Sequence, residues 1–103
     1  MSYNVKIMKK AQSDIETAFD WYNEQVPKLG LKYLNTIEKR LDFIMSFPFA
    51  SPMTLDYESV RYTLLIDYPF VIYYKIEPNL IVIIAVLHTS QNMEKLKLRQ
   101  EAN

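Results

Sequence analysis

The sequence predicts an α+β fold in which a hairpin of two helices packs on one face of a small antiparallel sheet. Between residues 11 and 44, apolar residues recur at steps of three and four, which is the period of amphipathic helices. A short alternating stretch precedes them, and three stretches rich in β-branched and aromatic residues follow. The expected order is strand, helix, helix, strand, strand, strand. A chain of 103 residues is expected to be one domain, which we place at 1–103.

The first strand is expected over 3–8, where Val5 and Ile7 alternate with polar residues. The run from Ser13 to Glu16 has the pattern of a capping box and predicts that the first helix begins there, although helical structure can begin a turn earlier, near Lys9. Pro27 suits the first turn of the second helix. The apolar stripes comprise Ala11, Ile15, Ala18, Tyr22 and Val26 in the first helix and Leu34, Ile37, Leu41 and Ile44 in the second.

Three further strands are expected over 59–66, 69–76 and 80–88. The turns between them are short, so these neighbours must be antiparallel, because a parallel return needs a dozen or more residues. The segment 93–101 can form one short C-terminal helix.

The segment 80–87 is apolar at every position, so a strand built from it needs cover on both faces. The helix hairpin can cover only one of them. The reverse face therefore requires either the C-terminal segment or another chain. The sequence alone favours neither solution.

Composition excludes several classes of function. The chain has no cysteine, so it can form neither a disulfide nor a thiolate metal site. A single histidine, His88, cannot supply a multi-histidine metal site. Gly30 is the only glycine, and both the Walker loop and the GxGxxG turn need several. These counts leave open only a magnesium site built from carboxylates. We therefore expect neither a metal nor a cofactor.

The chain shows no sign of membrane insertion or export. Its longest apolar run, 80–87, is far shorter than the roughly 20 residues that span a bilayer. The first residues lack the hydrophobic centre of a signal peptide, so we expect a cytoplasmic protein. Twelve basic residues balance twelve acidic ones, which leaves no overall charge to attract the molecule to nucleic acid or to anionic lipid.

Several short motifs, taken in their order and spacing, form a familiar pattern. They are Ala11 with Asp14-Ile15, Trp21-Tyr22, Leu29-Gly30, Val60-Arg61, Tyr68-Pro69-Phe70-Val71-Ile72-Tyr73-Tyr74 and Ile83-Ile84-Ala85-Val86-Leu87-His88. This pattern resembles the RelE/ParE superfamily of toxins from bacterial type II toxin-antitoxin systems, particularly the ParE-like plasmid-stabilisation branch. The resemblance extends over nearly the whole chain.

The resemblance implies a helical hairpin on an antiparallel sheet, in agreement with the order of elements expected from periodicity. It also implies a small protein that arrests growth when free. Such a protein is silenced by a cognate antitoxin, commonly encoded beside it, whose extended C-terminal segment wraps the toxin. The sequence also leaves open that the protein forms a homodimer.

The residues that follow His88 differ from those of the ParE-like branch. Its members commonly have an arginine and a proline after the histidine, where this chain has Gln91 and Met93. One expected cation is therefore missing. Three nearby cations can substitute for it in part and are candidate target-binding residues, namely Lys95, Lys97 and Arg99.

The superfamily divides between ribosome-dependent cleavage of messenger RNA and inhibition of DNA gyrase. RNA cleavage by a 2′-hydroxyl needs a base, a cation for the phosphorane and an acid for the leaving oxygen. His88 is the candidate base or acid and Arg61 the candidate phosphate ligand, with Tyr74 and Lys75 as weaker candidates. Each also has a structural interpretation. A histidine can bond locally at a strand end, an arginine can pair with nearby carboxylates, and a tyrosine can pack in the sheet.

Charge favours the gyrase-inhibiting class. The chain has no excess of cations for a site crowded with phosphates, and the expected first helix has an acidic polar side. We therefore expect a ParE-like inhibitor. A RelE-like messenger endoribonuclease and an inactive antitoxin-binding module are the alternatives, so the sequence leaves open whether the protein is an enzyme.

Overall fold

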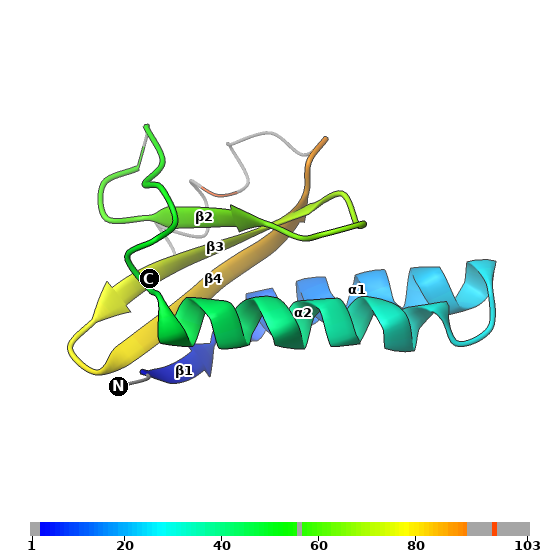
Figure 1. The fold of residues 1–103 in the computed structure, drawn as a ribbon. Coiled ribbons are helices and arrows are strands. Elements are labelled where there is room, and N and C mark those ends of the chain that lie inside the picture. The colour runs from blue at the N-terminus through cyan, green and yellow to red at the C-terminus, as the bar shows by residue number, and fades with distance from the viewer. Residues whose placement is uncertain (1–2, 56, 91–95, 97–103) are drawn as a thin grey trace.

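The computed structural model describes residues 3–55, 57–90 and Leu96. These residues form two helices and a four-stranded sheet in the predicted order, and both helices lie on the same side of the sheet (Figure 1). The elements are β1 (Asn4–Ile7), α1 (Lys9–Gln25), α2 (Leu29–Ser46), β2 (Arg61–Leu64), β3 (Phe70–Glu77) and β4 (Leu80–His88). The predicted α+β class with a helical hairpin is therefore confirmed.

The sheet has the strand order β1-β4-β3-β2. Both β2–β3 and β3–β4 are antiparallel, as their short turns predict. β1, however, pairs with β4 in parallel, from Asn4 opposite Leu80 to Ile7 opposite Ile83, so the sheet is mixed and not purely antiparallel. β1 and β4 are separated by all the other elements, and no tight turn between them fixes their relative direction.

The first helix begins at Lys9, with Met8 as its N-cap, so a start at Ser13 is wrong and the earlier start is confirmed. The Met8 N–H donates to the Ile83 carbonyl, and the Gln12 N–H donates to the Met8 carbonyl, which closes the first turn ahead of Ser13. The helix ends at Gln25. Val26, expected on the apolar stripe, is the C-cap and is exposed.

The second helix begins at Leu29, and Pro27 lies in the preceding turn and not in the first turn of the helix. Gly30 lies at the close approach of the two helices. Its N–H donates to Asn23 Oδ1 at 2.9 Å. A Cβ at this position would lie 2.7 Å from Asn23 Oδ1 and 2.8 Å from Phe19 Cδ1, so a larger residue would have to displace its neighbours.

A β-bulge divides the side chains of β4 between the two faces. Tyr73 pairs with Ala85 and Tyr74 with Ile83, which leaves Ile84 as the additional residue on β4. Before the bulge, Ile83 belongs to the core under the helices, and after it Val86 does so. The bulge explains why the buried positions of β4 follow no single alternation.

The reverse face of β4 is buried within the chain itself. Ile84, Ala85 and Leu87 form a second cluster with Val60 and Leu96, against which Tyr57 and Tyr73 pack. Leu96, the described residue of the C-terminal segment, is helical and fully buried. Of the two alternatives, cover by the C-terminal segment and not by another chain is therefore the one that these residues show. The connection between α2 and β2, which contributes Tyr57 and Val60, was not expected to provide cover.

The rest of the helix expected over 93–101 lies outside the described residues. Within the described part, neither helix combines the length and apolar character that a bilayer-crossing segment requires.

Candidate functional site

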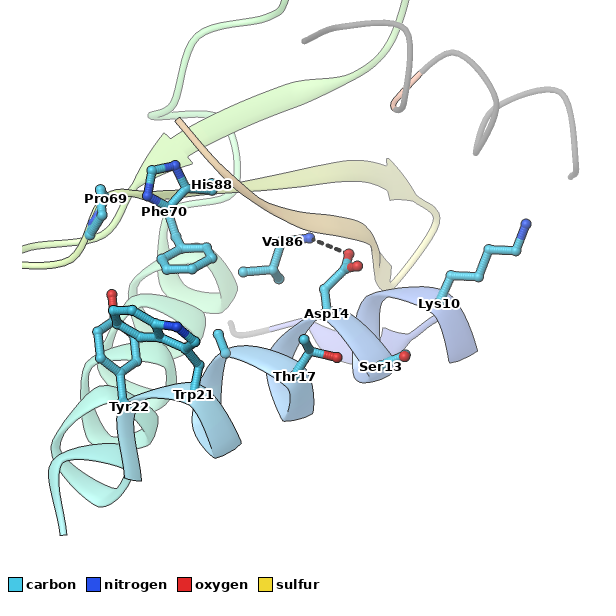
Figure 2. Close-up of a pocket in the computed structure, with 11 residues that line it drawn as sticks. Lys10, Ser13, Asp14, Thr17, Trp21, Tyr22, Pro69, Phe70, Val86 and His88 are labelled. Atoms are coloured by element: carbon cyan, nitrogen blue, oxygen red, sulfur yellow. Dashed lines mark hydrogen bonds between the residues drawn. The ribbon is translucent and has the colours of Figure 1, made fainter. Parts of the chain in front are cut away.

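A groove of about 740 Å³ separates α1 from the adjoining ends of β3 and β4. β1 pairs only with the first part of β4, up to Ile83, and the chain then turns away into α1. The remainder of β4 consequently faces the helix across the groove (Figure 2). The helix lines this groove with one face that runs from Lys10 to Tyr22, and the sheet lines it with Pro69, Phe70, Val86 and His88.

One end of the groove has an aromatic wall. Trp21 and Tyr22 meet edge to face with ring centroids 5.1 Å apart, and Tyr22 lies 6.3 Å from Phe70. Phe70 in turn meets the His88 ring at 5.3 Å. Trp21 is 55% exposed although it is the largest side chain of the protein. An exposed tryptophan beside an apolar groove is typical of a binding surface.

Asp14 bridges the groove at its middle. Its Oδ2 accepts a hydrogen bond from the Val86 N–H at 3.0 Å, across 72 positions of sequence (Figure 2). The carboxylate thus occupies the place on β4 where a neighbouring strand would put a carbonyl. Sequence reasoning assigned Asp14 to a capping box and missed this role. The available signal was an acidic residue that borders the apolar stripe of Ala11 and Ile15.

His88, a predicted catalytic candidate, lies in the wall of this groove at the end of β4. Its Nδ1 accepts a hydrogen bond from the Ser90 N–H at 3.0 Å and lies 2.8 Å from Ser90 Oγ. In the neutral ring the proton is therefore on Nε2. This local bonding at a strand end matches the structural interpretation of the residue.

Arg61 lies on another part of the molecule, at the start of β2. Its Nη1 donates to the Ser51 carbonyl at 2.6 Å and to the Phe49 carbonyl at 3.4 Å. The guanidinium also lies over the Phe49 ring, with Cζ 5.2 Å from the centroid. The arginine thus fastens the segment before β2 to the sheet.

The other predicted candidates have separate surroundings. Tyr74 is fully buried, and its hydroxyl donates to the Pro48 carbonyl at 2.8 Å. Lys75 follows it on β3 and, by strand alternation, lies on the opposite face, half-buried. Lys95, Lys97 and Arg99 lie outside the described residues.

The sheet keeps Arg61 and His88 apart. Arg61 pairs with Tyr74 and His88 with Phe70, on opposite sides of β3. These pairing positions are four residues apart, which is roughly 13 Å along a strand. Among the described residues, moreover, no group of three or more acidic, histidine or cysteine side chains could hold a metal ion.

Residues 5–93 match the family model described as ParE toxin of type II toxin-antitoxin system, parDE. The match takes in most of the sequence, with both helices and all four strands except Asn4 at the start of β1. The chain belongs to this ParE toxin family. A comparison with curated proteins finds no match.

Two solved structures have the same fold as this ParE-family chain. The chromosomal ParDE toxin-antitoxin system from P. aeruginosa has a TM-score of 0.75 at 19% identity, over 84% of this chain and 96% of that one. An arginine double mutant of the E. coli toxin RelE in the free state has a TM-score of 0.63 at 14% identity, over 99% and 95%. At these identities the likeness shows the fold alone.

Two tyrosines of this ParE-family chain have a raised pKa near the aromatic wall, namely Tyr22 in the wall and Tyr33 behind it. Burial, together with the nearby Tyr68, raises the pKa of Tyr22 above its ordinary value. Tyr33 packs on Tyr22, with ring centroids 5.3 Å apart, and is fully buried. Its hydroxyl has no hydrogen-bond partner among the described residues, and burial raises its pKa strongly.

Proposed function

We propose that this ParE-family chain inhibits growth by acting on DNA gyrase in the cytoplasm and is neutralised by a cognate antitoxin. The observation that carries the choice of target is the separation of Arg61 from His88 across the sheet. Membership of the ParE toxin family supports the same assignment.

An endoribonuclease would need its base, acid and phosphate ligand around one scissile bond, each within hydrogen-bond reach of a reacting atom. The Arg61 guanidinium is instead bound to two backbone carbonyls, and the Tyr74 hydroxyl is bound to a third. Neither group faces the groove that contains His88. These contacts support a toxin that binds a protein target over one that cleaves RNA.

Charge supports this choice. The net charge is zero, whereas a protein that binds among phosphates draws much of its affinity from surplus lysine and arginine. On sequence grounds, Lys95, Lys97 and Arg99 are the proposed contacts to the target. Their replacement by alanine is expected to weaken gyrase inhibition.

The proposal is tested by induced expression with and without the open reading frame beside the gene. We expect growth to stop, and the neighbouring product to restore it. Purified protein should inhibit gyrase supercoiling, and His88→Gln should inhibit equally well. New messenger ends in primer extension, abolished in His88→Gln, would instead establish an RNase. Growth that is indifferent to both reading frames would leave an antitoxin-binding module without toxicity.

A further inference from the structure

We propose that an exposed aromatic patch at the end of α2 is a surface with which the toxin binds gyrase, and that the complementary surface of gyrase is apolar and acidic. The patch consists of Phe43, Phe47, Phe49 and Ile66, with Arg40 beside them. This inference rests on the proposed function, because it assigns a surface of the toxin to the proposed target.

The first argument is the exposure of three phenylalanines that follow closely in sequence. Phe43 is 36% exposed, Phe47 59% and Phe49 62%. The rings of Phe43 and Phe47 pack on each other, with centroids 5.6 Å apart. Phe43 also lines a groove of about 370 Å³ together with Ile66, which follows β2 and is exposed as well. Large apolar side chains that gather at one place on a protein surface mark an interaction site, whereas scattered ones do not.

The second argument is that the backbone holds two of these rings outward. Pro48, between Phe47 and Phe49, is buried, and its carbonyl accepts a hydrogen bond from the Tyr74 hydroxyl at 2.8 Å. Because Pro48 faces inward, the phenylalanines on either side of it face solvent. Arg61 binds the Phe49 carbonyl, and its guanidinium lies over the Phe49 ring. Side chains that are fixed in place before binding lose little conformational entropy in a complex.

The third argument is charge. The Arg40 guanidinium lies over the ring three positions farther along α2, with Cζ 5.0 Å from the centroid, and makes no ion pair within the described residues. Lys39 and Arg40 both line the groove, against one acid, Asp67. The acids of α2, Glu38 and Asp42, are not part of its lining. A partner that places carboxylates beside apolar residues would therefore match this surface.

The size of the patch favours a separate target over a second copy of the chain. Three phenylalanines exposed to this degree present roughly 300 Å² of apolar surface, since a whole aromatic side chain offers about 150–250 Å². Obligate dimers bury more than about 2,000 Å² and are apolar over most of that area. An aromatic centre with arginine and a charged rim is instead typical of a non-obligate interface. A symmetric pair would also place the cations of the patch opposite the same cations.

The apolar part of the patch is tested by supercoiling assays with purified gyrase and the full-length toxin. Phe47→Ala and Phe49→Ala should each raise the toxin concentration for half-maximal inhibition by about tenfold or more. Leu31→Ala is the matched control, because Leu31 is 54% exposed on the same helix but lies at its opposite end, and it should inhibit like the wild type. Thermal melts verify that each variant folds. If Phe47→Ala does not fold, Phe49→Ala provides the same test, because Phe49 lies beyond the helix.

Arg40→Glu and Arg40→Gln test the charge of the partner. An acidic partner predicts that charge reversal weakens inhibition more than the neutral amide does, and that inhibition by the wild type falls as salt is raised. Lys28→Glu makes the same change of charge at the start of α2, outside the patch, and should have little effect. Inhibition by Arg40→Glu that equals that of the wild type would show that the partner surface is not acidic and would overturn the inference.

Three further results would overturn the inference and leave the proposed function intact. The first is a wild-type toxin that inhibits gyrase and a folded Phe49→Ala variant that inhibits it equally well. The second is a variant that inhibits gyrase normally but binds the neighbouring product less tightly, which would assign the patch to the antitoxin. The third is a wild-type dimer that Phe47→Ala converts to monomers with unchanged inhibition. If the wild-type toxin does not inhibit gyrase, both the inference and the proposed function are wrong.

Discussion

At Gly30 the two helices approach too closely for a side chain. The Cβ of an alanine would lie under 3 Å from atoms of Asn23 and Phe19, one of which accepts the Gly30 N–H. Alanine is the better helix former, by about 0.5–1 kcal/mol. Overpacking at a close contact costs about 1–3 kcal/mol and should therefore dominate.

We accordingly expect Gly30→Ala to lower the free energy of unfolding by about 1–2 kcal/mol, net of the gain in helix propensity. Urea denaturation followed by circular dichroism measures this difference. Leu31→Ala, at the next and exposed position, is the control and should change stability by about 0.5 kcal/mol or less. An unchanged midpoint for Gly30→Ala would mean that Asn23 and Phe19 move aside without cost.

Tyr33 has a hydroxyl that the fold buries without a partner among the described residues. A buried polar group left without a hydrogen bond costs about 1–3 kcal/mol. Tyr33→Phe should therefore raise the free energy of unfolding at pH 7 by about 1 kcal/mol, because only this atom is removed.

The same residue gives the protein a dependence on alkaline pH. The pKa of Tyr33 is raised in the folded state, so the unfolded state releases this proton first, at its ordinary pKa near about 10. The contribution of Tyr33 ionisation to the free energy of unfolding is therefore constant below this pH. The free energy of unfolding falls as the pH rises above it. We expect the advantage of Tyr33→Phe over the wild type, measured by urea denaturation, to be constant from pH 7 to 9 and to grow above about 10. An advantage independent of pH would show that the Tyr33 hydroxyl titrates normally.

At the scale of elements, the connection between α2 and β2 acts as a strap over the reverse face of the sheet. Tyr74 binds it at Pro48, and Arg61 binds it at Phe49 and Ser51. Farther along, Tyr57 and Val60 reach the second apolar cluster. Arg61 and Tyr74, two of the residues that the sequence offered as catalytic candidates, thus hold this strap in place.

Tyr74→Phe tests the strap. It removes the donor to the buried Pro48 carbonyl, and we expect a loss of about 1–2 kcal/mol in the free energy of unfolding. Tyr62→Phe, at a half-exposed position of the neighbouring strand, should cost less. Gyrase inhibition by the folded Tyr74→Phe protein should equal that of the wild type. Loss of activity with unchanged stability would instead assign the hydroxyl to the target site.

At the scale of the whole molecule, the sheet is covered on both faces by its own chain. The helices cover one face, while Val60 and Leu96 close the second cluster. The free toxin should therefore fold without its antitoxin. It should be a monomer by size-exclusion chromatography and should melt in a single cooperative transition.

Leu96→Ala should lower the free energy of unfolding by about 2–5 kcal/mol, because it opens a cavity against Ile84 and Leu87. Leu55→Ala, at a fully exposed position, is the control and should have little effect. A free protein that melts cooperatively only when the antitoxin is added would contradict the prediction. It would show that the reverse face of the sheet needs another chain to cover it.

The sequence by itself determined the order of elements and the helical hairpin. It also excluded disulfides, thiolate metal sites and glycine-rich nucleotide loops. Periodicity predicts the helices and strands from short stretches of sequence. Residues three or four apart share a face of a helix, and successive residues alternate between the two faces of a strand. The missing cysteines and the single glycine exclude whole classes of site by count alone. The family pattern likewise survives in short motifs, and the match over residues 5–93 confirms it.

Only the tertiary structure decided where the groove lies and what forms it. The parallel pairing of β1 ends at Ile83, the bulge at Ile84 changes which side chains of β4 face the helices, and Asp14 reaches Val86 from far away in sequence. The same pairing separates Arg61 from His88. These outcomes depend on which strands become neighbours once the chain has closed on itself, and no local period records that choice.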